Sequence, residues 1–321
     1  MPDNAALSEA QLLEATIPPS PIVQQWRELQ TFLYNPKDGT VMGRTGWEWL
    51  QVIAFYLAFY GFLAAFFAAA LHLFMMTLDP RQPRWQRDSG QIGTTPGMGF
   101  RPRPPDPESQ LLWINSTAKQ MYIDQLKTFL APYTNQATNN GPLLDCSPMS
   151  LTPNTTVTQP DDTHSDYVCK FDMSLLGACA EKYDFGYNTN QPCVLLKINK
   201  IYGWFPNVMT PVPSEVTAFQ QSIQLISPPD SQSIPVTCAG ETELDSALLG
   251  PLAMYPASLP QSFFPYQGQA NYLSPVVMLQ FLDLPRDVIV NVRCKFWVPD
   301  VVHDAAKGWA TVGLQIMLNS E

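Results

Sequence analysis

The feature that most constrains this chain is residues 49–78, which contain no Asp, Glu, Lys or Arg. The hydrocarbon core of a bilayer needs about 20 apolar residues of helix to cross it, because lipid cannot pair with a free backbone amide. A soluble helix of this length normally keeps a polar face. The apolar part is also far longer than the roughly 7–15 apolar residues of a cleaved signal peptide. The sequence therefore predicts one uncleaved membrane-spanning helix.

This helix divides the chain into four expected parts. We predict a cytosolic tail at 1–48, the transmembrane helix at 49–78, an extracellular stalk at 79–110 and an ectodomain at 111–321. Acidic residues outnumber basic ones to give a net charge of −10. A protein that binds nucleic acid needs an excess of Lys and Arg to replace phosphate counterions, so nucleic acid is not expected as a partner.

The ectodomain is expected to be mainly β. The chain has 31 prolines, and each one inside a helix costs about 3 kcal/mol. Apolar residues alternate with polar ones over 288–298 and again over 310–318, which predicts strands with one buried face. Residues 116–130 predict one helix that Pro132 ends. We expect an immunoglobulin-like antiparallel β-sandwich with one packed helix, in which Cys294 reaches across the layers.

The cysteines indicate which side of the membrane the ectodomain occupies. All six follow the apolar helix, and an even set confined to one side is typical of disulfides in an oxidising compartment. A zinc site would need closer cysteine pairs than these. Two glycosylation motifs, at Asn115 and Asn154, also follow the helix. We therefore predict a type II protein with a cytosolic N-terminus, although the basic residues that flank the helix favour neither orientation. The cysteines are Cys146, Cys169, Cys179, Cys193, Cys238 and Cys294.

Two faces of the apolar helix differ in character. Small residues, among them Gly61, share one face and would let another helix approach closely. Tyr56, Tyr60 and Phe67 share the opposite face, where a tyrosine hydroxyl in lipid costs free energy unless a neighbour accepts its hydrogen bond. One reading is that the tyrosines lie near the membrane surface. The alternative, which we favour, is that these four residues contact the helices of a partner.

No catalytic constellation is evident. The chain has three histidines, and a nucleophile–histidine site has few candidates among them. His164 lies in an acidic loop segment and His303 stands next to Asp304. Golgi glycosyltransferases share the type II topology, but the Asp-x-Asp motif that many use to hold a metal–nucleotide does not occur. We expect a protein that is not an enzyme and that carries neither a cofactor nor a metal.

Seven motifs occur in an order that resembles a known family. They are FLYNPKDGTVMGRTGWEW, FYLAFYGFLAAFF, PGMGFRP, DFGYNTNQPCVLLKINKIYGWFP, VTCAGE, FFPYQGQANYLSPVVMLQF and NVRCKFW. Together they are similar to the β-subunits of the sodium/potassium-transporting P-type ATPases and of the related proton/potassium pump. The resemblance runs from about Phe32 to the C-terminus. The phosphorylation motif of the catalytic α-subunit, Asp-Lys-Thr-Gly-Thr, does not occur.

The resemblance implies a partner and a set of contacts. It implies a non-catalytic subunit at the plasma membrane that helps the α-subunit to fold, assemble and reach the membrane, and that modulates potassium affinity. It implies that Tyr56 and Tyr60 face the seventh transmembrane helix of the α-subunit. Membrane lipid and a small third single-span subunit are further implied neighbours. The ectodomain contacts implied are Phe263, Phe264, Pro265, Tyr266 and Tyr272.

The resemblance also implies disulfides paired in sequence order: Cys146–Cys169, Cys179–Cys193 and Cys238–Cys294. From the residues alone, six cysteines allow 15 pairings. The alternatives that stay open are a proton/potassium-pump subunit, a type II adhesion or receptor glycoprotein and, third, a glycosyltransferase.

Overall fold

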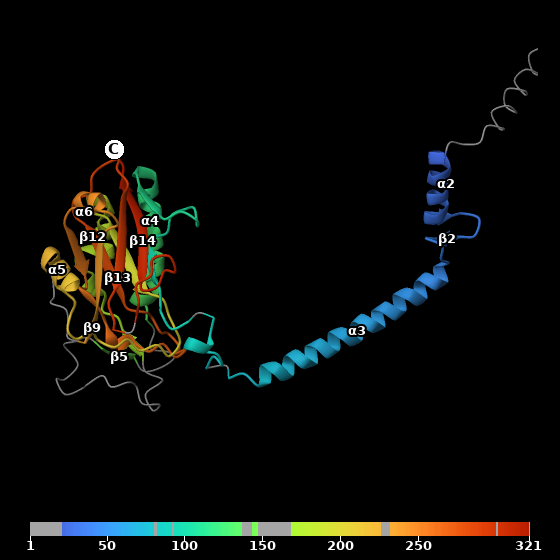
Figure 1. Cartoon of the computed structure of the whole chain (residues 1–321), viewed down its shortest axis with the longest axis horizontal. Coiled ribbons are helices and arrows are strands. Elements are labelled where there is room, and N and C mark those ends of the chain that lie inside the picture. The colour runs from blue at the N-terminus through green and yellow to red at the C-terminus, as the bar shows by residue number, and fades with distance from the viewer. Residues whose placement is uncertain are drawn as a thin grey trace, which may run out of the picture. The chain divides into compact units, whose positions relative to one another are not determined.

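The computed structural model of the chain describes residues 21–79, 82–91, 93–136, 143–146, 168–225, 232–299 and 301–320. The chain divides between Leu78 and Asp79 into two compact units, which Figure 1 colours from blue to red along the sequence. The first unit contains the apolar helix, and the second contains the β-rich ectodomain.

The first unit consists of two helices joined by a hairpin. The apolar helix starts at Gly46, three residues earlier than expected, because Thr45 and Glu48 form a capping box. The Thr45 amide donates to Glu48 Oε2 at 2.8 Å, and the Glu48 amide donates to Thr45 Oγ1 at 3.4 Å. Trp49 Nε1 donates to the Val41 carbonyl at 2.8 Å and ties the hairpin to the first turn. The elements are α2 (Pro21–Leu33), β1 (Tyr34–Asn35), β2 (Thr40–Val41) and α3 (Gly46–Met76).

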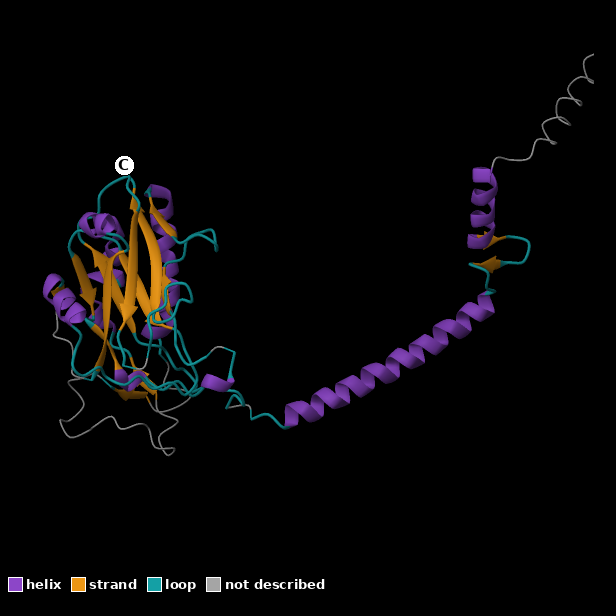
Figure 2. Cartoon of the chain, in the orientation of Figure 1, coloured by secondary structure: helices purple, strands orange, loops and turns teal. Residues whose placement is uncertain are grey.

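Two five-stranded sheets form the ectodomain, and Figure 2 shows them in orange. The first sheet has the order β3 (Met98–Arg101), β7 (Cys193–Ile198), β12 (Val276–Phe281), β10 (Leu252–Tyr255), β8 (Gln224–Leu225). The second has the order β11 (Ser258–Pro260), β9 (Ser233–Gly240), β13 (Val290–Phe296), β14 (Thr311–Leu318), β4 (Leu111–Ile114). A small parallel sheet of β5 (Leu143–Asp145) and β6 (Val168–Lys170) lies outside both.

The helices of the ectodomain are α4 (Ser116–Thr134), α5 (Ser214–Ser222) and α6 (Glu243–Leu249), and the short 3₁₀ helices are η1 (Arg87–Ser89), η4 (Met173–Cys179), η5 (Glu181–Thr189) and η6 (Gln261–Phe263). The single packed helix of the prediction corresponds to α4. The shorter α5 and α6 were not expected, and α6 begins at a capping box formed by Thr242 and Asp245.

The expectation of an antiparallel arrangement is wrong at two edges. β4 pairs with β14 in parallel, and β8 pairs with β10 in parallel. Each of these edge strands is separated from its partner by a long stretch of chain, so no tight hairpin forces them to be antiparallel. The other pairs within the two large sheets are antiparallel.

The alternating pattern of the sequence is confirmed in β13, where buried residues alternate with half-buried ones from Val290 to Phe296. Val288, which the pattern also assigned to the buried face, is 38% exposed because the strand begins only at Val290. β12 is buried at every position, since it lies inside its sheet and both of its faces are covered. One cluster of buried side chains includes residues of both sheets and of α4.

Pro132 does not end α4 as expected. The helix continues to Thr134 with Pro132 inside its last turn. The reason is tertiary: Tyr133 is buried, and its hydroxyl donates to the Ser274 carbonyl at 2.7 Å. At the other end, Asn115 caps the helix by accepting from the amides of Thr117 and Ala118 at 3.0 and 2.7 Å.

The segment 79–110, expected as a stalk, contributes to the sheet. Its residues Met98–Arg101 form β3, which pairs with β7 along its whole length. Phe100 is 2% exposed and belongs to the common core. The sequence shows no periodicity there because four residues flanked by Gly and Pro are too few to display it.

Candidate partner-binding surfaces

α3 is an apolar surface that its own unit leaves almost entirely exposed. None of its residues is buried, and Leu57 and Phe62 are 70% and 76% exposed. Its 31 residues span about 46 Å at 1.5 Å per residue, more than the roughly 30 Å of a hydrocarbon core. Within the part of the chain that the structure describes, α3 is the one helix long and apolar enough to cross a membrane. Lipid or another protein must therefore cover it.

The predicted contact residues of α3 are all open to the surroundings of the helix. The rings of Tyr56 and Tyr60 stack 5.9 Å apart, and their side chains are 49% and 58% exposed. Neither hydroxyl has a hydrogen-bond partner among the described residues. Phe67 follows on the same face and is 65% exposed. Gly61 lies about 100° around the helix from Tyr60, and a Cβ added there would meet no atom within 4 Å.

The predicted ectodomain contacts are mostly core residues. Phe263, Phe264 and Tyr272 are 6–8% exposed, and Pro265 is also buried. Phe263 packs against Phe171, and the ring of Phe264 lies 5.4 Å from that of Trp204. Only Tyr266 of the predicted five keeps part of its side chain at the surface. The other four are buried within the ectodomain, and their part in binding a partner stays a prediction.

Tyr266 belongs to a tyrosine–lysine cluster with Lys200, Tyr202 and Tyr272. The Tyr266 ring lies 5.0 Å from that of Tyr272 and 6.3 Å from that of Tyr202. Lys200 Nζ lies 5.0 and 4.8 Å from the centres of the Tyr266 and Tyr272 rings, and it donates to the Tyr272 carbonyl at 3.1 Å. Cation–π contacts of this kind hold the ammonium against the aromatic faces.

Burial, and then the charge of Lys197, lower the pKa of Lys200 from its usual value. Burial, the Asp79 carboxylate and Tyr266 raise the pKa of Tyr202. The cluster therefore lies close to Asp79, the first residue of the ectodomain unit. Sequence reasoning missed Lys200 and Tyr202. The sequence feature that could have identified them is their spacing. Lys200 and Tyr202 stand two residues apart just after β7, and in an extended strand such residues point to the same side.

The three expected disulfides are present: Cys146–Cys169, Cys179–Cys193 and Cys238–Cys294. The disulfide of Cys294 was predicted to cross between the two layers. This prediction is wrong. Cys238 on β9 and Cys294 on β13 are direct cross-strand neighbours within one sheet. The alternating pattern placed Cys294 on the buried face but could not show that its partner strand lies beside it.

Of the two predicted glycosylation sites, the structure describes Asn115 but not Asn154. Asn115 is half-exposed at the start of α4, and its Oδ1 caps the helix while no hydrogen bond of its Nδ2 occurs within the described residues. An N-linked glycan is attached through that nitrogen, so capping and modification can coexist. Asn154 lies outside the described residues.

The described residues include no group of three or more His, Cys, Asp or Glu placed to hold a metal ion. His303 Nε2 lies 2.8 Å from the Phe296 carbonyl, and its ring lies 4.6 Å from that of Trp297. These contacts give His303 a structural role. His164 lies outside the described residues.

Comparison with known proteins covers both units. The sequence model of the family "Sodium / potassium ATPase beta chain" matches residues 20–312. The sodium/potassium-transporting ATPase subunit beta-2 of Drosophila melanogaster is 32% identical over 91% of this chain and 92% of its own. The probable subunit beta-3 of Caenorhabditis briggsae is 33% identical over 86% and 82%. The human subunit beta-2 is 29% identical over 88% and 89%.

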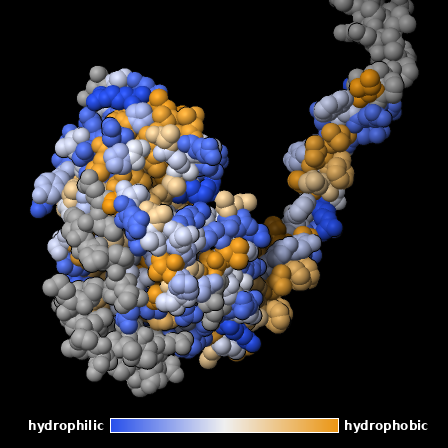
Figure 3. All heavy atoms as spheres, turned by 60° about the vertical axis from the view of Figure 1, so that its left-hand side comes forward, coloured by the Kyte–Doolittle hydropathy of each residue, from blue (hydrophilic) through white to orange (hydrophobic). Residues whose placement is uncertain are grey.

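The chain is thus a protein with one candidate transmembrane helix and a disulfide-bonded, mainly β ectodomain. It belongs to the β-chain family of the sodium/potassium ATPase. Hydrophilic and hydrophobic residues are interspersed over the face of the ectodomain that Figure 3 shows, so hydropathy alone does not mark a docking site there.

Proposed function

We propose that this chain is the non-catalytic β-subunit of a sodium/potassium pump, and that it helps the catalytic α-subunit to fold, assemble and reach the plasma membrane. The observation that carries the proposal is the family match over residues 20–312, which includes both α3 and the ectodomain. A folded partner that binds only the folded α-subunit stabilises it by mass action. The chain's own part is to supply the surfaces for that binding.

The proposed topology is a single crossing by α3, with residues 1–48 in the cytosol and the C-terminal ectodomain outside. Three disulfides after the helix support this orientation, since they form in oxidising compartments. Residues 79–110 would leave the membrane as a connection that ends in the sheet. An immunoglobulin-like sandwich is the fold class we propose for 111–321 together with β3, supported by two five-stranded sheets that share one core.

In the membrane, the proposed contact is the face of Tyr56, Tyr60 and Phe67, with Gly61 permitting close approach. A hydroxyl without an acceptor in lipid costs free energy, so Tyr56 and Tyr60 favour a polar neighbour over lipid. Bound lipid would cover the remaining apolar surface of α3. The small third subunit stays a prediction of the resemblance.

Outside the membrane, the tyrosine–lysine cluster is the proposed contact. Tyr266 and Tyr202 would meet an extracellular loop of the α-subunit, while Phe263, Phe264, Pro265 and Tyr272 hold them in place. Aromatic residues with a polar tip are typical of interface contacts. If these contacts differ between two states of the pump, the β-subunit shifts their populations and hence the apparent potassium affinity.

The test is co-expression of the full chain with a sodium/potassium ATPase α-subunit and purification in mild detergent. Each interhelical hydrogen bond in a membrane contributes about 0.6 kcal/mol, so changing both Tyr56 and Tyr60 to Phe should weaken association about eightfold. The matched control is Phe62→Leu, because Phe62 lies about 200° around the helix from Tyr60. Equal co-purification and equal potassium affinity of the double variant and the control would refute the membrane half of the proposal.

A further inference from the structure

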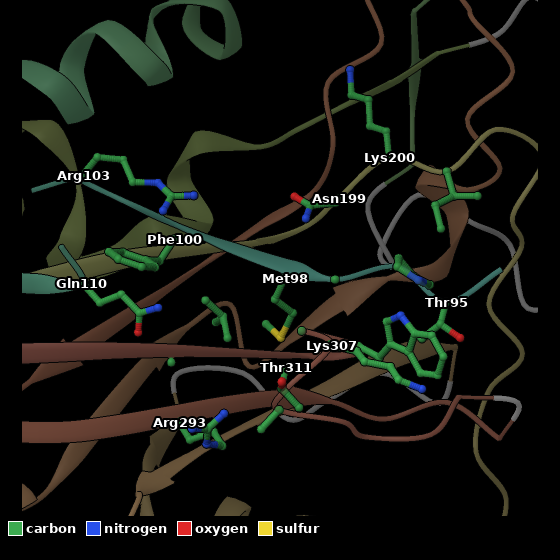
Figure 4. Close-up of a pocket in the computed structure, with 18 residues that line it drawn as sticks. Thr95, Met98, Phe100, Arg103, Gln110, Asn199, Lys200, Arg293, Lys307 and Thr311 are labelled. Carbon is green, nitrogen blue, oxygen red and sulfur yellow. The ribbon is translucent and has the colours of Figure 1, made fainter. Parts of the chain in front are cut away.

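The ectodomain contains a polar pocket, shown in Figure 4, that Lys200 helps to line. Because Lys200 also belongs to the tyrosine–lysine cluster, this pocket adjoins a surface that already has a proposed partner. The helix α2 has no assigned partner. The contacts proposed for an α-subunit involve α3 and the ectodomain, so the surface of α2 still needs an explanation.

The residues of α2 are segregated by polarity. Four large apolar side chains lie within about 60° of one another around the helix, at 100° per residue. We call these four the apolar stripe: Ile22, Trp26, Leu29 and Leu33. The opposite side of the helix carries polar residues, namely Gln24, Arg27, Glu28 and Thr31. A helix of this kind packs its apolar side against an apolar environment and turns its polar side to water.

The apolar stripe is open. Its four side chains are 47–66% exposed, although large apolar side chains gain free energy from burial. The 13 residues of α2 span about 20 Å, so the helix is too short to cross a hydrocarbon core of about 30 Å. An amphipathic helix can instead lie in the surface of a bilayer, with its apolar side about 5–10 Å deep at the boundary between headgroups and acyl chains.

Hydrogen bonds tie α2 to the point where α3 begins. The Met42 amide donates to the Leu33 carbonyl at 3.1 Å, which joins the end of α2 to the hairpin. Trp49 Nε1, in the first turn of α3, bonds to the neighbouring Val41 carbonyl. Glu48 is the last charged residue before the apolar run, so the hairpin lies at the depth of the lipid headgroups when α3 crosses a bilayer. The end of α2 therefore lies at the membrane surface.

The charges around α2 favour no particular lipid. Anionic lipids attract segments with a net positive charge. Residues 21–48 contain as many acidic as basic residues: Glu28, Asp38 and Glu48 against Arg27, Lys37 and Arg44. Burial of the apolar stripe is then the main source of binding, and it should not depend on the charge of the headgroups.

We propose that α2 is an interfacial anchor, which lies in the surface of the bilayer that α3 crosses and places the apolar stripe against the acyl chains. The occupant of the stripe is lipid and not protein. This inference rests on the proposed membrane crossing of α3. It depends neither on the α-subunit nor on the side of the membrane that the N-terminus occupies.

The anchor gives α3 a fixed depth. α3 is about 46 Å long, and a helix longer than the hydrocarbon core can tilt or shift along its axis. Interfacial groups at the helix ends decide between these positions. Because α2 is tied to the first turn of α3, it holds Tyr56 and Tyr60 at a constant depth in the membrane.

The test is site-directed spin labelling of the full-length chain in lipid nanodiscs with one chain per disc. The six native cysteines form the three disulfides, so an introduced cysteine is the only free thiol. Nitroxides at Leu29→Cys and Gln24→Cys compare the two sides of α2, and Phe62→Cys marks the exposed surface of α3. Oxygen, which dissolves among acyl chains, and a water-soluble nickel chelate report the surroundings of each label through their collision rates.

The label at position 29 should collide often with oxygen, and several times less often with the chelate than the label at position 24. Discs of phosphatidylcholine and discs with added phosphatidylserine should give the same values. Adding Trp26→Glu to Leu29→Cys should raise the collision rate with the chelate, because a charge in the apolar stripe is costly among acyl chains. Gln24→Glu adds the same charge on the polar side and is the matched control, which should leave that rate unchanged.

Three results would overturn the proposal. Equal accessibility of positions 24 and 29 to the chelate would place both in water. Low accessibility of position 29 to oxygen and chelate alike would show that protein covers the apolar stripe. Shielding of position 29 only in discs with phosphatidylserine would contradict binding by apolar burial. The label at position 62 separates this failure from that of the proposed topology: collisions with the chelate there would refute the membrane crossing of α3, whereas a label exposed to oxygen alone would confine the failure to α2.

Discussion

Removing the Cys238–Cys294 disulfide should destabilise the ectodomain more than removing Cys179–Cys193. The first closes a loop with a sequence separation of 56 residues and the second one of 14. In the chain-entropy description these loops contribute about 4 and about 3 kcal/mol, and the difference depends only on the ratio of their lengths, giving about 1.2 kcal/mol. All four cysteines are 0–2% exposed, so changing either pair to Ala leaves a comparable cavity.

The assay is urea unfolding of the full-length chain in detergent, followed by tryptophan fluorescence, because Trp204 is buried in the core. Each double Cys→Ala variant is compared with the oxidised parent. The account predicts the lower free energy of unfolding, and hence the lower urea midpoint, for the Cys238/Cys294 variant. A larger loss for the Cys179/Cys193 variant would refute the loop-entropy reasoning and show that native contacts around the sulfurs dominate.

Three further predictions concern single positions. Gly240→Ala should lower the free energy of unfolding by about 1–3 kcal/mol or more, because the added Cβ would lie 2.1 Å from a backbone nitrogen of α6. In Gly313→Ala the atom nearest to the added Cβ lies at 3.6 Å, so urea unfolding should show no measurable loss of stability. Tyr133→Phe should cost about 1–3 kcal/mol in the same assay, because it leaves a buried carbonyl unpaired; no loss would mean that water replaces the hydroxyl. Hydrogen bonds from Asn291 and Thr242 lower the pKa of Asp245 in the fold. Asp245 should therefore stabilise the fold above its unfolded pKa of about 3.9 and lose this effect as the pH falls through the lower folded value. The stability of Asp245→Asn should therefore depend less on pH in that window, and an identical pH profile would contradict this.

Local patterns predicted the elements that those patterns dominate. The charge-free run predicted α3, because every residue of a membrane-spanning helix lies in apolar surroundings. Strict alternation predicted β13 and β14, because successive side chains of a half-buried strand point to opposite faces of the sheet. The start of α4 was predictable from Asn115, a residue type that caps helices. The disulfide pairing came from the family resemblance and not from spacing.

Long-range contacts account for what the sequence could not show. β3 is four residues long and exists because β7 pairs with it. The parallel edges of β4 and β8 depend on where the chain returns after long excursions. Tyr133 carries α4 past Pro132 through a bond to a residue 141 positions away. None of these contacts leaves a periodic trace in its own segment.

The candidate sites were predictable to different degrees. On α3 the helical period alone placed Tyr56, Tyr60 and Phe67 on one face. In the ectodomain, aromatic residues of the motif at 263–272 looked like contact residues, yet four of the five predicted are buried. An aromatic side chain serves equally well in a core and in an interface, so composition does not separate the two roles.

The most direct test of the central claim is the native mass of the full chain after co-expression with a sodium/potassium ATPase α-subunit and purification in mild detergent. The account predicts one stable complex that contains both chains in equal number. When the α-subunit is expressed without this chain, it should stay unfolded or fail to reach the plasma membrane. A chain that purifies alone, beside an α-subunit that folds and reaches the plasma membrane equally well without it, would contradict the account.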